Sequence, residues 1–303
     1  MWMVLLGGLA AAASLELNIE GPARYHGEAL IQSGTPVQLL ASNNINARVV
    51  MIGVAIDYTC VGRTSDRGWA MDCEMDNVGL QGAAFSPQEQ EGVDAIMTEY
   101  AGFMEEASVQ IELNPDGRVR LVDIEGIDKR DERMRNVHEY IRLIVRRTFA
   151  PLDIQMPRKS EADVDDKWKR KSGGLTFELF SRFGTVGGSL IKYVLTEATA
   201  EQLTVTHEGR GNIGVSSAGA TLTMEDGATD STTSALYNTL SSGYGYFDPS
   251  SHRWLYAEYQ TQGTLNQAAT SGVNQFTQAA WIGRINDDGT VEGPEGPRRL
   301  DAE

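Results

Sequence analysis

The chain has 303 residues, 41% of them hydrophobic and 22% charged, enough apolar material for one large core or two modest ones. Its 26 basic and 42 acidic residues give a formal net charge of −16. That charge repels nucleic acids and anionic lipid surfaces at long range, so no nucleic-acid partner is expected. The acidity itself is consistent with simple solubility or with a role in recognition.

The first residues are apolar and end in small side chains. Ala11-Ala12-Ala13 before Ser14 predicts a signal peptide over residues 1–13, cleaved between Ala13 and Ser14. The absence of Lys and Arg before the apolar run departs from the usual signal pattern. The run is shorter than the roughly 20 residues of a spanning helix, and no later segment is apolar for long enough. The sequence therefore predicts a periplasmic or secreted protein with no transmembrane span in the mature chain.

Cys60 and Cys73 are the only cysteines. Each lies in a segment that alternates like a strand, and the polar loop 62–68 between them can turn the chain back. Neighbouring strands would place the two sulfur atoms together, and disulfides persist in oxidising compartments. We expect a structural disulfide, with a pair of buried free thiols as the alternative.

The first half alternates strand patterns with two helical patterns. Strands are expected at Val37–Leu40 and Arg48–Ile56 before a helix that begins at Ser86, with Glu89 completing a capping box. A hairpin turning at Asn114–Gly117 follows. A second helix, capped by Asp128, is expected to end before Pro151. The expected apolar helix faces are Val93, Ile96, Met97, Tyr100, Phe103 and Met104, and Met134, Val137, Ile141, Ile144 and Val145.

Beyond the charged connector Pro157–Asp166, the second half is nearly all β. Strands are predicted at Leu175–Phe180, Ser189–Thr196, Gln202–His207, Gly211–Thr223, Tyr244–Phe247, Trp254–Tyr259 and Phe276–Ile285. The predicted domains are a β-rich unit with two helices at 14–157, an antiparallel β unit at 158–290, and a flexible tail at 291–303. A weak similarity between the two Pro-containing hairpins leaves open whether the halves are a duplication, and whether they form one sheet or two.

A Trp-led segment, Asp165-Asp166-Lys167-Trp168, opens a run of long strands. Together with Asp166–Thr206 and Gly245–Gly263, it resembles a loosely defined group of uncharacterised exported β-rich bacterial proteins. The resemblance covers about one fifth of the chain and implies an architecture similar to lipoprotein carriers. The expected fold class is α+β, mainly antiparallel, with a curved or half-barrel sheet packed against two amphipathic helices. It further implies binding of a lipid or acyl chain, although one fold hosts many functions.

No residue pattern predicts catalysis, a cofactor or a metal. The histidines His26, His138, His207 and His252 stand singly, and none has a metal-site spacing. We expect the His138 imidazole, between apolar helix positions, to have its hydrogen bonds satisfied within the protein. We expect His252 to be a solvated turn residue. Neither Asp163, Asp165 and Asp166 nor Asn286–Gly289 completes a calcium-binding loop. The first group is therefore expected in a solvated linker, and the second in a hairpin turn.

The leading hypothesis is a non-enzymatic cell-envelope protein that binds an apolar ligand in a curved β-sheet cavity. The alternative is a structural or interaction module of an envelope assembly, with Tyr244, Tyr246, Tyr256 and Tyr259 as an exposed contact strip. Ordinary strand positions would explain the same tyrosines. An enzyme whose site is assembled from residues far apart in the sequence also stays open.

Overall fold

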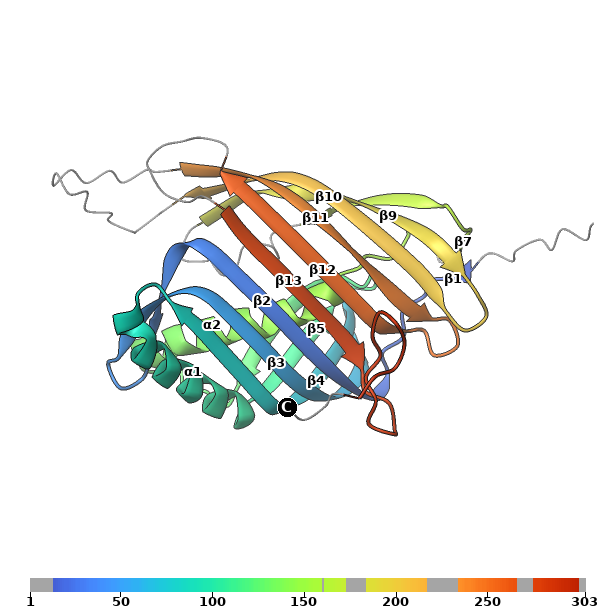
Figure 1. The fold of residues 1–303 in the computed structure, drawn as a ribbon. Helices are drawn as coiled ribbons and strands as arrows, with labels where there is room; N and C mark the ends of the chain where they lie inside the picture. Colours follow the sequence, from blue (N-terminus) through green and yellow to red (C-terminus); the bar gives the residue numbers. More distant parts are fainter. Residues whose placement is uncertain (1–12, 160, 173–183, 217–233, 266–274, 300–303) are drawn as a thin grey trace, which may run out of the picture.

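The computed structural model describes residues 13–159, 161–172, 184–216, 234–265 and 275–299 (Figure 1). Eleven antiparallel strands form one sheet in the order β6-β5-β4-β3-β2-β13-β12-β11-β10-β9-β8. Their bounds are β2 Gly21–Leu40, β3 Asn46–Ser65, β4 Gly68–Ala84, β5 Ser108–Leu113, β6 Val119–Glu125, β8 Lys167–Ser172, β9 Gly184–Ala198, β10 Leu203–Ser216, β11 Ser234–Asp248, β12 Arg253–Leu265 and β13 Gln275–Arg284. The sheet is open, because β6 and β8 are edges that do not pair with each other. The α+β class with a curved, open sheet is confirmed.

The two predicted halves meet within this single sheet. β13 pairs with β2 from Phe276 opposite Ser33 to Arg284 opposite Tyr25. Both predicted domains therefore contribute strands to one sheet, and the two halves do not form separate sheets. Residues 285–299, which include most of the expected flexible tail, fold back through bridges from Val291 to Ile285 and Arg298.

Two helices lie against one face of the sheet, and Figure 1 shows the strands bending around α2. α1 (Gln90–Glu105) packs on β4 and β3, and α2 (Glu132–Phe149) packs on β2, β3, β6 and β13. Short 3₁₀ turns precede α1 at Pro87–Glu89 and follow α2 at Ala150–Leu152, named η1 and η2. We call the face that carries the helices the inner face and the opposite face the outer face.

Both helix starts differ in detail from the prediction. The Ser86 hydroxyl donates to the Glu89 carboxylate at 2.8 Å instead of capping a backbone amide, because a 3₁₀ turn intervenes before α1. The cap of α2 is Asp131, which accepts from the backbone amides of Arg133 and Met134. Asp128 closes an earlier turn through the Arg130 amide, so its assignment as the cap was wrong.

The core lies between the helices and the inner face. The expected helix faces are buried there, except that Phe103 and Met134 stay partly exposed. Strand residues that alternate inward complete the core, and Gly27 lets α2 approach β2, since a Cβ there would meet the Thr148 Cβ at 3.0 Å. Within the described ranges, no helix is both long and apolar enough to cross a membrane.

The predicted disulfide joins Cys60 on β3 to Cys73 on β4. The two residues are directly opposite in the ladder, and both side chains face the core. Ala13 and Ser14 form a two-residue strand, β1, that pairs with β7 (Glu161–Ala162), so β7 lies inside the predicted connector. The cleavage between Ala13 and Ser14 stays a prediction. The strand expected at Leu175–Phe180 lies outside the described residues.

Candidate functional site

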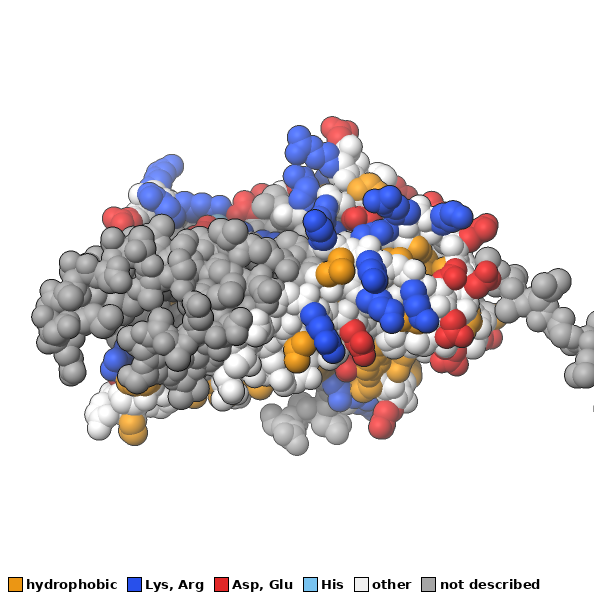
Figure 2. Space-filling model, turned by 90° about the horizontal axis from the view of Figure 1, so that it is seen from above, with side chains coloured by type: hydrophobic (Ala, Val, Ile, Leu, Met, Phe, Trp, Pro, Cys, Tyr) orange, Lys and Arg blue, Asp and Glu red, His pale blue; other side chains and the backbone are white. Residues whose placement is uncertain are grey.

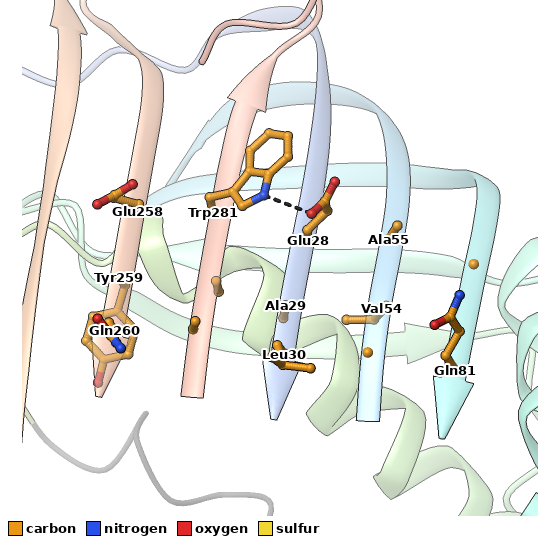
Figure 3. A pocket seen from close by; sticks show the side chains of 14 residues that line it. Glu28, Ala29, Leu30, Val54, Ala55, Gln81, Glu258, Tyr259, Gln260 and Trp281 are labelled. Carbon is orange, nitrogen blue, oxygen red and sulfur yellow. Dashed lines mark hydrogen bonds between the residues drawn. The ribbon is translucent and has the colours of Figure 1, made fainter. Parts of the chain in front are cut away.

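A groove of about 540 Å³ crosses the outer face over β4, β3, β2, β13 and β12 (Figure 3). The ladder registers arrange its outward side chains in two rows across these strands. The first row reads Gln81, Gly53, Leu30, Ala279, Gln260, and the second reads Gly79, Ala55, Glu28, Trp281, Glu258. Strands lie about 4.8 Å apart, so each row of five spans roughly 19 Å.

The hollow exists because four outward positions carry little or no side chain. Gly53, Gly79, Ala55 and Ala279 form its floor. Leu30 stands among them with 44% of its surface exposed, and Trp281 borders the floor. Polar side chains border this floor, with Gln81 on β4 at one end and Gln260 and Glu258 on β12 at the other. The Glu28 carboxylate lies in the middle of the second row.

Trp281 and Glu28 are held by a polar network beside the floor. The Trp281 indole nitrogen donates to Glu28 at 3.0 Å, the dashed line in Figure 3. His26 lies between two carboxylates, with Nε2 3.3 Å from Glu28 and Nδ1 2.6 Å from Asp57. The Arg298 guanidinium lies 4.7 Å from the centre of the Trp281 ring. The ring is therefore held at its edge by Glu28 and covered by the Arg298 guanidinium.

The carboxylates around His26 favour its protonated form. Burial lowers the pKa of His26, but hydrogen bonds to Asp57 and Glu28 outweigh this and raise that pKa above its ordinary value. The hydrogen bond from His26, joined by the one from Trp281, lowers the pKa of Glu28. For Asp57, burial raises the pKa, but hydrogen bonds from His26 and Asn77 bring it below the usual range. The groove thus keeps an ionised Glu28 at neutral pH.

The four tyrosines do not form one contact strip. Tyr244, Tyr246 and Tyr256 cluster on the outer face with ring centroids 5.4–5.9 Å apart. Tyr256 is buried, and the Tyr246 hydroxyl donates to the Pro294 carbonyl of the folded-back segment. Tyr259 points to the inner face, where its ring stacks on His207. The protein's own chain therefore covers part of the predicted strip, and the strand alternation divides the rest between two faces.

The space between the helices and the sheet is filled by protein side chains. A hollow of about 20 Å³ lies there, between η2 and strands β9, β10 and β12. A larger one of about 730 Å³ opens beside β8, where Leu17, Trp69 and Met156 are among the residues that line it. His207 lines the smaller hollow with a buried Nδ1 that has no described partner, and burial lowers the pKa of this imidazole to about 4. The smaller hollow holds one water molecule and no acyl chain. The hollow beside η2 is therefore too small for the apolar ligand expected between the helices and the sheet.

Other candidate residues have structural roles. His138 is buried on α2 with Nε2 2.9 Å from the Ile124 carbonyl oxygen, which confirms a satisfied imidazole. His252 is not simply solvated, because its Nδ1 lies 3.0 Å from the Glu16 carbonyl oxygen. Asn286–Gly289 forms the predicted turn, closed by a bond from the Gly289 amide to the Asn286 carbonyl. Around Asp163, Asp165 and Asp166 as elsewhere in the described ranges, no group of three His, Cys, Asp or Glu side chains could hold a metal ion.

Sequence reasoning missed the groove. Its residues come from five strands, and only the ladder register places Trp281 beside Glu28 or Gly53 beside Leu30. The available signal was the small outward residue at alternating strand positions 53, 55 and 79, where a large one is usual. Such residues indicate a hollow only once their neighbours are known.

No family model and no curated protein matches this chain, so the resemblance to exported bacterial proteins stays a prediction. Among solved structures, the chain is similar to one of lipovitellin, described as showing lipid–protein interactions. The TM-score is 0.49, with 12% identity over 94% of this chain and 27% of that chain. This chain thus spans about a quarter of the lipovitellin chain. Similarity at this level identifies no shared ligand.

Proposed function

We propose that the chain is an exported, non-enzymatic cell-envelope protein that binds an apolar or amphiphilic ligand, such as an acyl chain, in the outer groove. The observation that carries this proposal is the floor of Gly53, Gly79, Ala55 and Ala279 around the exposed Leu30. An apolar chain on this floor would remove Leu30 and the Trp281 border from water, which is favourable. The disulfide between buried cysteines supports export.

The dimensions of the groove suit such a ligand. Its volume of about 540 Å³ lies within the roughly 300–1,000 Å³ of small-molecule sites. Its width of roughly 19 Å is comparable with the ~15 Å hydrocarbon layer of one membrane leaflet. Glu258 and Gln260 at the β12 end, or Gln81 at the β4 end, would then meet the polar end of an amphiphile.

The test fills the groove without disturbing the sheet. A Cβ at Gly53 would meet nothing closer than the Gln81 Cβ at 3.9 Å, and one at Gly79 nothing closer than Ala55 at 3.8 Å. The Gly53→Val and Gly79→Leu variants therefore place side chains in the hollow at ordinary contact distances. Gly102→Leu is the matched control, because nothing lies within 4 Å of a Cβ at this exposed position on α1.

Titration with a bromine-labelled fatty acid, followed by tryptophan emission, reports binding near Trp281. We expect quenching in the wild type and in Gly102→Leu, and its loss in Gly79→Leu and in Trp281→Phe. Native mass spectrometry of protein from its own host should show a lipid mass that Gly79→Leu lacks. Quenching that persists undiminished in the filled-groove variants would place the ligand elsewhere, and no quenching in the wild type would reject an acyl ligand.

A further inference from the structure

Most of the lysines of this acidic chain lie in one part of the outer face, whereas its arginines are spread along the sequence. Five of its six lysines lie between positions 159 and 192. Lys167, Lys169 and Lys171 alternate along β8, Lys192 follows on β9 and Arg210 on β10, all pointing outward and exposed. Figure 2 shows Lys and Arg side chains gathered on this side of the molecule, with hydrophobic side chains between them.

We propose that this surface, the basic patch of Lys167, Lys169, Lys171, Lys192 and Arg210, docks onto a lipid bilayer that carries anionic headgroups. None of the five side chains forms an ion pair with another residue in the described ranges. Their charges are therefore available to lipid phosphates. Acidic residues are also near: Glu208 lies beside Lys192 in the ladder, and the exposed Asp165 and Asp166 directly precede Lys167.

Apolar side chains within the patch favour a membrane over other polyanions. One ladder row alternates Lys171, Leu190, Arg210 and Leu240. Leu190 is 49% exposed and Leu240 is 57% exposed. Basic residues that meet headgroups, next to apolar residues that enter the acyl boundary, are the combination that holds proteins at a bilayer surface. Binding of nucleic acid would leave both leucines without an apolar partner.

Protection of the sheet edge explains only part of this charge. Lysines on an edge strand discourage pairing with another chain, and β8 is such an edge. Lys192 and Arg210 lie on β9 and β10, which are paired on both sides. Edge protection therefore does not account for the positive charge of Lys192 and Arg210.

The net charge of −16 does not prevent docking. At physiological ionic strength, electrostatic interactions in water are screened over about 8 Å, so the surface nearest the bilayer dominates. Acidic residues more than this distance from the bilayer are screened from it, so the molecule would orient with the patch toward the lipid. The expectation of repulsion, drawn from net charge alone, applies at long range.

Vesicle co-sedimentation tests the docking. We expect binding to phosphatidylcholine vesicles that contain phosphatidylglycerol, no binding to phosphatidylcholine alone, and weakening at high salt. Each basic residue near the surface contributes about fivefold in affinity, so the combined Lys169→Gln, Lys192→Gln, Arg210→Gln variant should bind roughly a hundredfold more weakly. Arg67→Gln, Lys129→Gln, Arg130→Gln removes the same charge elsewhere and should bind like the wild type.

A second set of vesicle-binding measurements tests the two exposed leucines of the patch. The Leu190→Ser, Leu240→Ser variant should bind roughly tenfold more weakly, whereas Val61→Ser, at an equally exposed position, should not change binding. Equal binding to both vesicle types, or equal loss in the patch and control variants, would overturn the proposal. So would a protein that binds a labelled oligonucleotide but no vesicle. The filled-groove variant Gly79→Leu should still sediment, so failure of the groove and failure of the patch are distinguishable.

Discussion

Truncation of Phe149 tests whether the inner face is a packed core or a ligand cavity. This side chain, at the end of α2, is fully buried, and its ring centre lies 4.6 Å from that of Tyr58 on β3. The neighbouring Thr148 hydroxyl lies 2.6 Å from the Tyr58 hydroxyl oxygen. Phe149 thus occupies the middle of the space that a half-barrel carrier would leave open for its ligand.

The expected cost of Phe149→Ala is about 4 kcal/mol in the free energy of unfolding. Removing a fully buried phenylalanine costs roughly 3–5 kcal/mol, the sum of lost transfer free energy and the cavity left behind. At about 2 °C per kcal/mol in a chain of this size, Tm should fall by roughly 8 °C. Phe85→Ala is the control, because Phe85 is 50% exposed and its ring lies under the Arg48 guanidinium, so its loss should cost less than about 1 kcal/mol.

Urea unfolding followed by circular dichroism measures both values, with fatty-acid quenching as a parallel readout. The truncation should leave the affinity for the bromine-labelled fatty acid unchanged, since the proposed groove lies on the opposite face. A cost below about 1 kcal/mol together with tighter fatty-acid binding would refute the reasoning. It would mean that the interior accepts a ligand where we describe a packed core.

Three further predictions concern stability. Replacing Cys60 and Cys73 by alanine should cost about 3 kcal/mol, as expected for a cross-link with a sequence separation of 13, and the thermal midpoint of the wild type should fall under reductant. Asp131→Ala should cost about 1 kcal/mol in urea unfolding through loss of the α2 cap, and Asp128→Ala less than half of that. Because the folded pKa of His26 is raised, its contribution is complete below its unfolded pKa and is lost as pH rises through the folded value. His26→Gln should therefore destabilise more at pH about 5.5 than at pH about 9, and an equal loss at both would contradict the ion pairing.

The local elements of this fold could be predicted from the sequence. The Asn114–Gly117 turn between alternating segments gave the β5–β6 hairpin, and the spacing of Val93, Ile96 and Tyr100 gave the buried face of α1. Both rest on interactions between residues close in the chain. The cap of α2 was misplaced by three residues because Asp128 and Asp131 have the same side chain, and only the helix geometry decides between them.

The sheet and the groove depend on contacts that no local pattern records. β13 pairs with β2 across more than half of the chain, and this pairing alone places Trp281 opposite Glu28. The charge on His26 likewise depends on Asp57, which lies on the next strand. The two-residue alternation of a strand shows which of its residues share a face, but it does not determine the order of the strands within a sheet.

The two faces of the sheet explain why ligand binding is assigned to the outer one. The packing of α2 on the inner face buries Phe149, Ile144 and Tyr58. This burial stabilises the fold only while the space between α2 and the sheet stays closed to solvent. Admitting a ligand between α2 and the sheet would require α2 to move and would expose these residues to solvent or ligand. The outer groove needs no such opening, because its floor is already exposed.

The groove and the basic patch are also continuous. The ladder row that crosses the groove through Gln81, Leu30 and Gln260 runs on through Ser242 and Glu208 to Lys192 and Lys169. A bilayer held at the basic patch would therefore lie along the same row as the groove floor, within about 38 Å from end to end. An acyl ligand could then pass between bilayer and groove along one face, without any rearrangement of the core. This path predicts that the patch variant, which retains an intact groove, should bind soluble fatty acid normally yet acquire it more slowly from anionic vesicles.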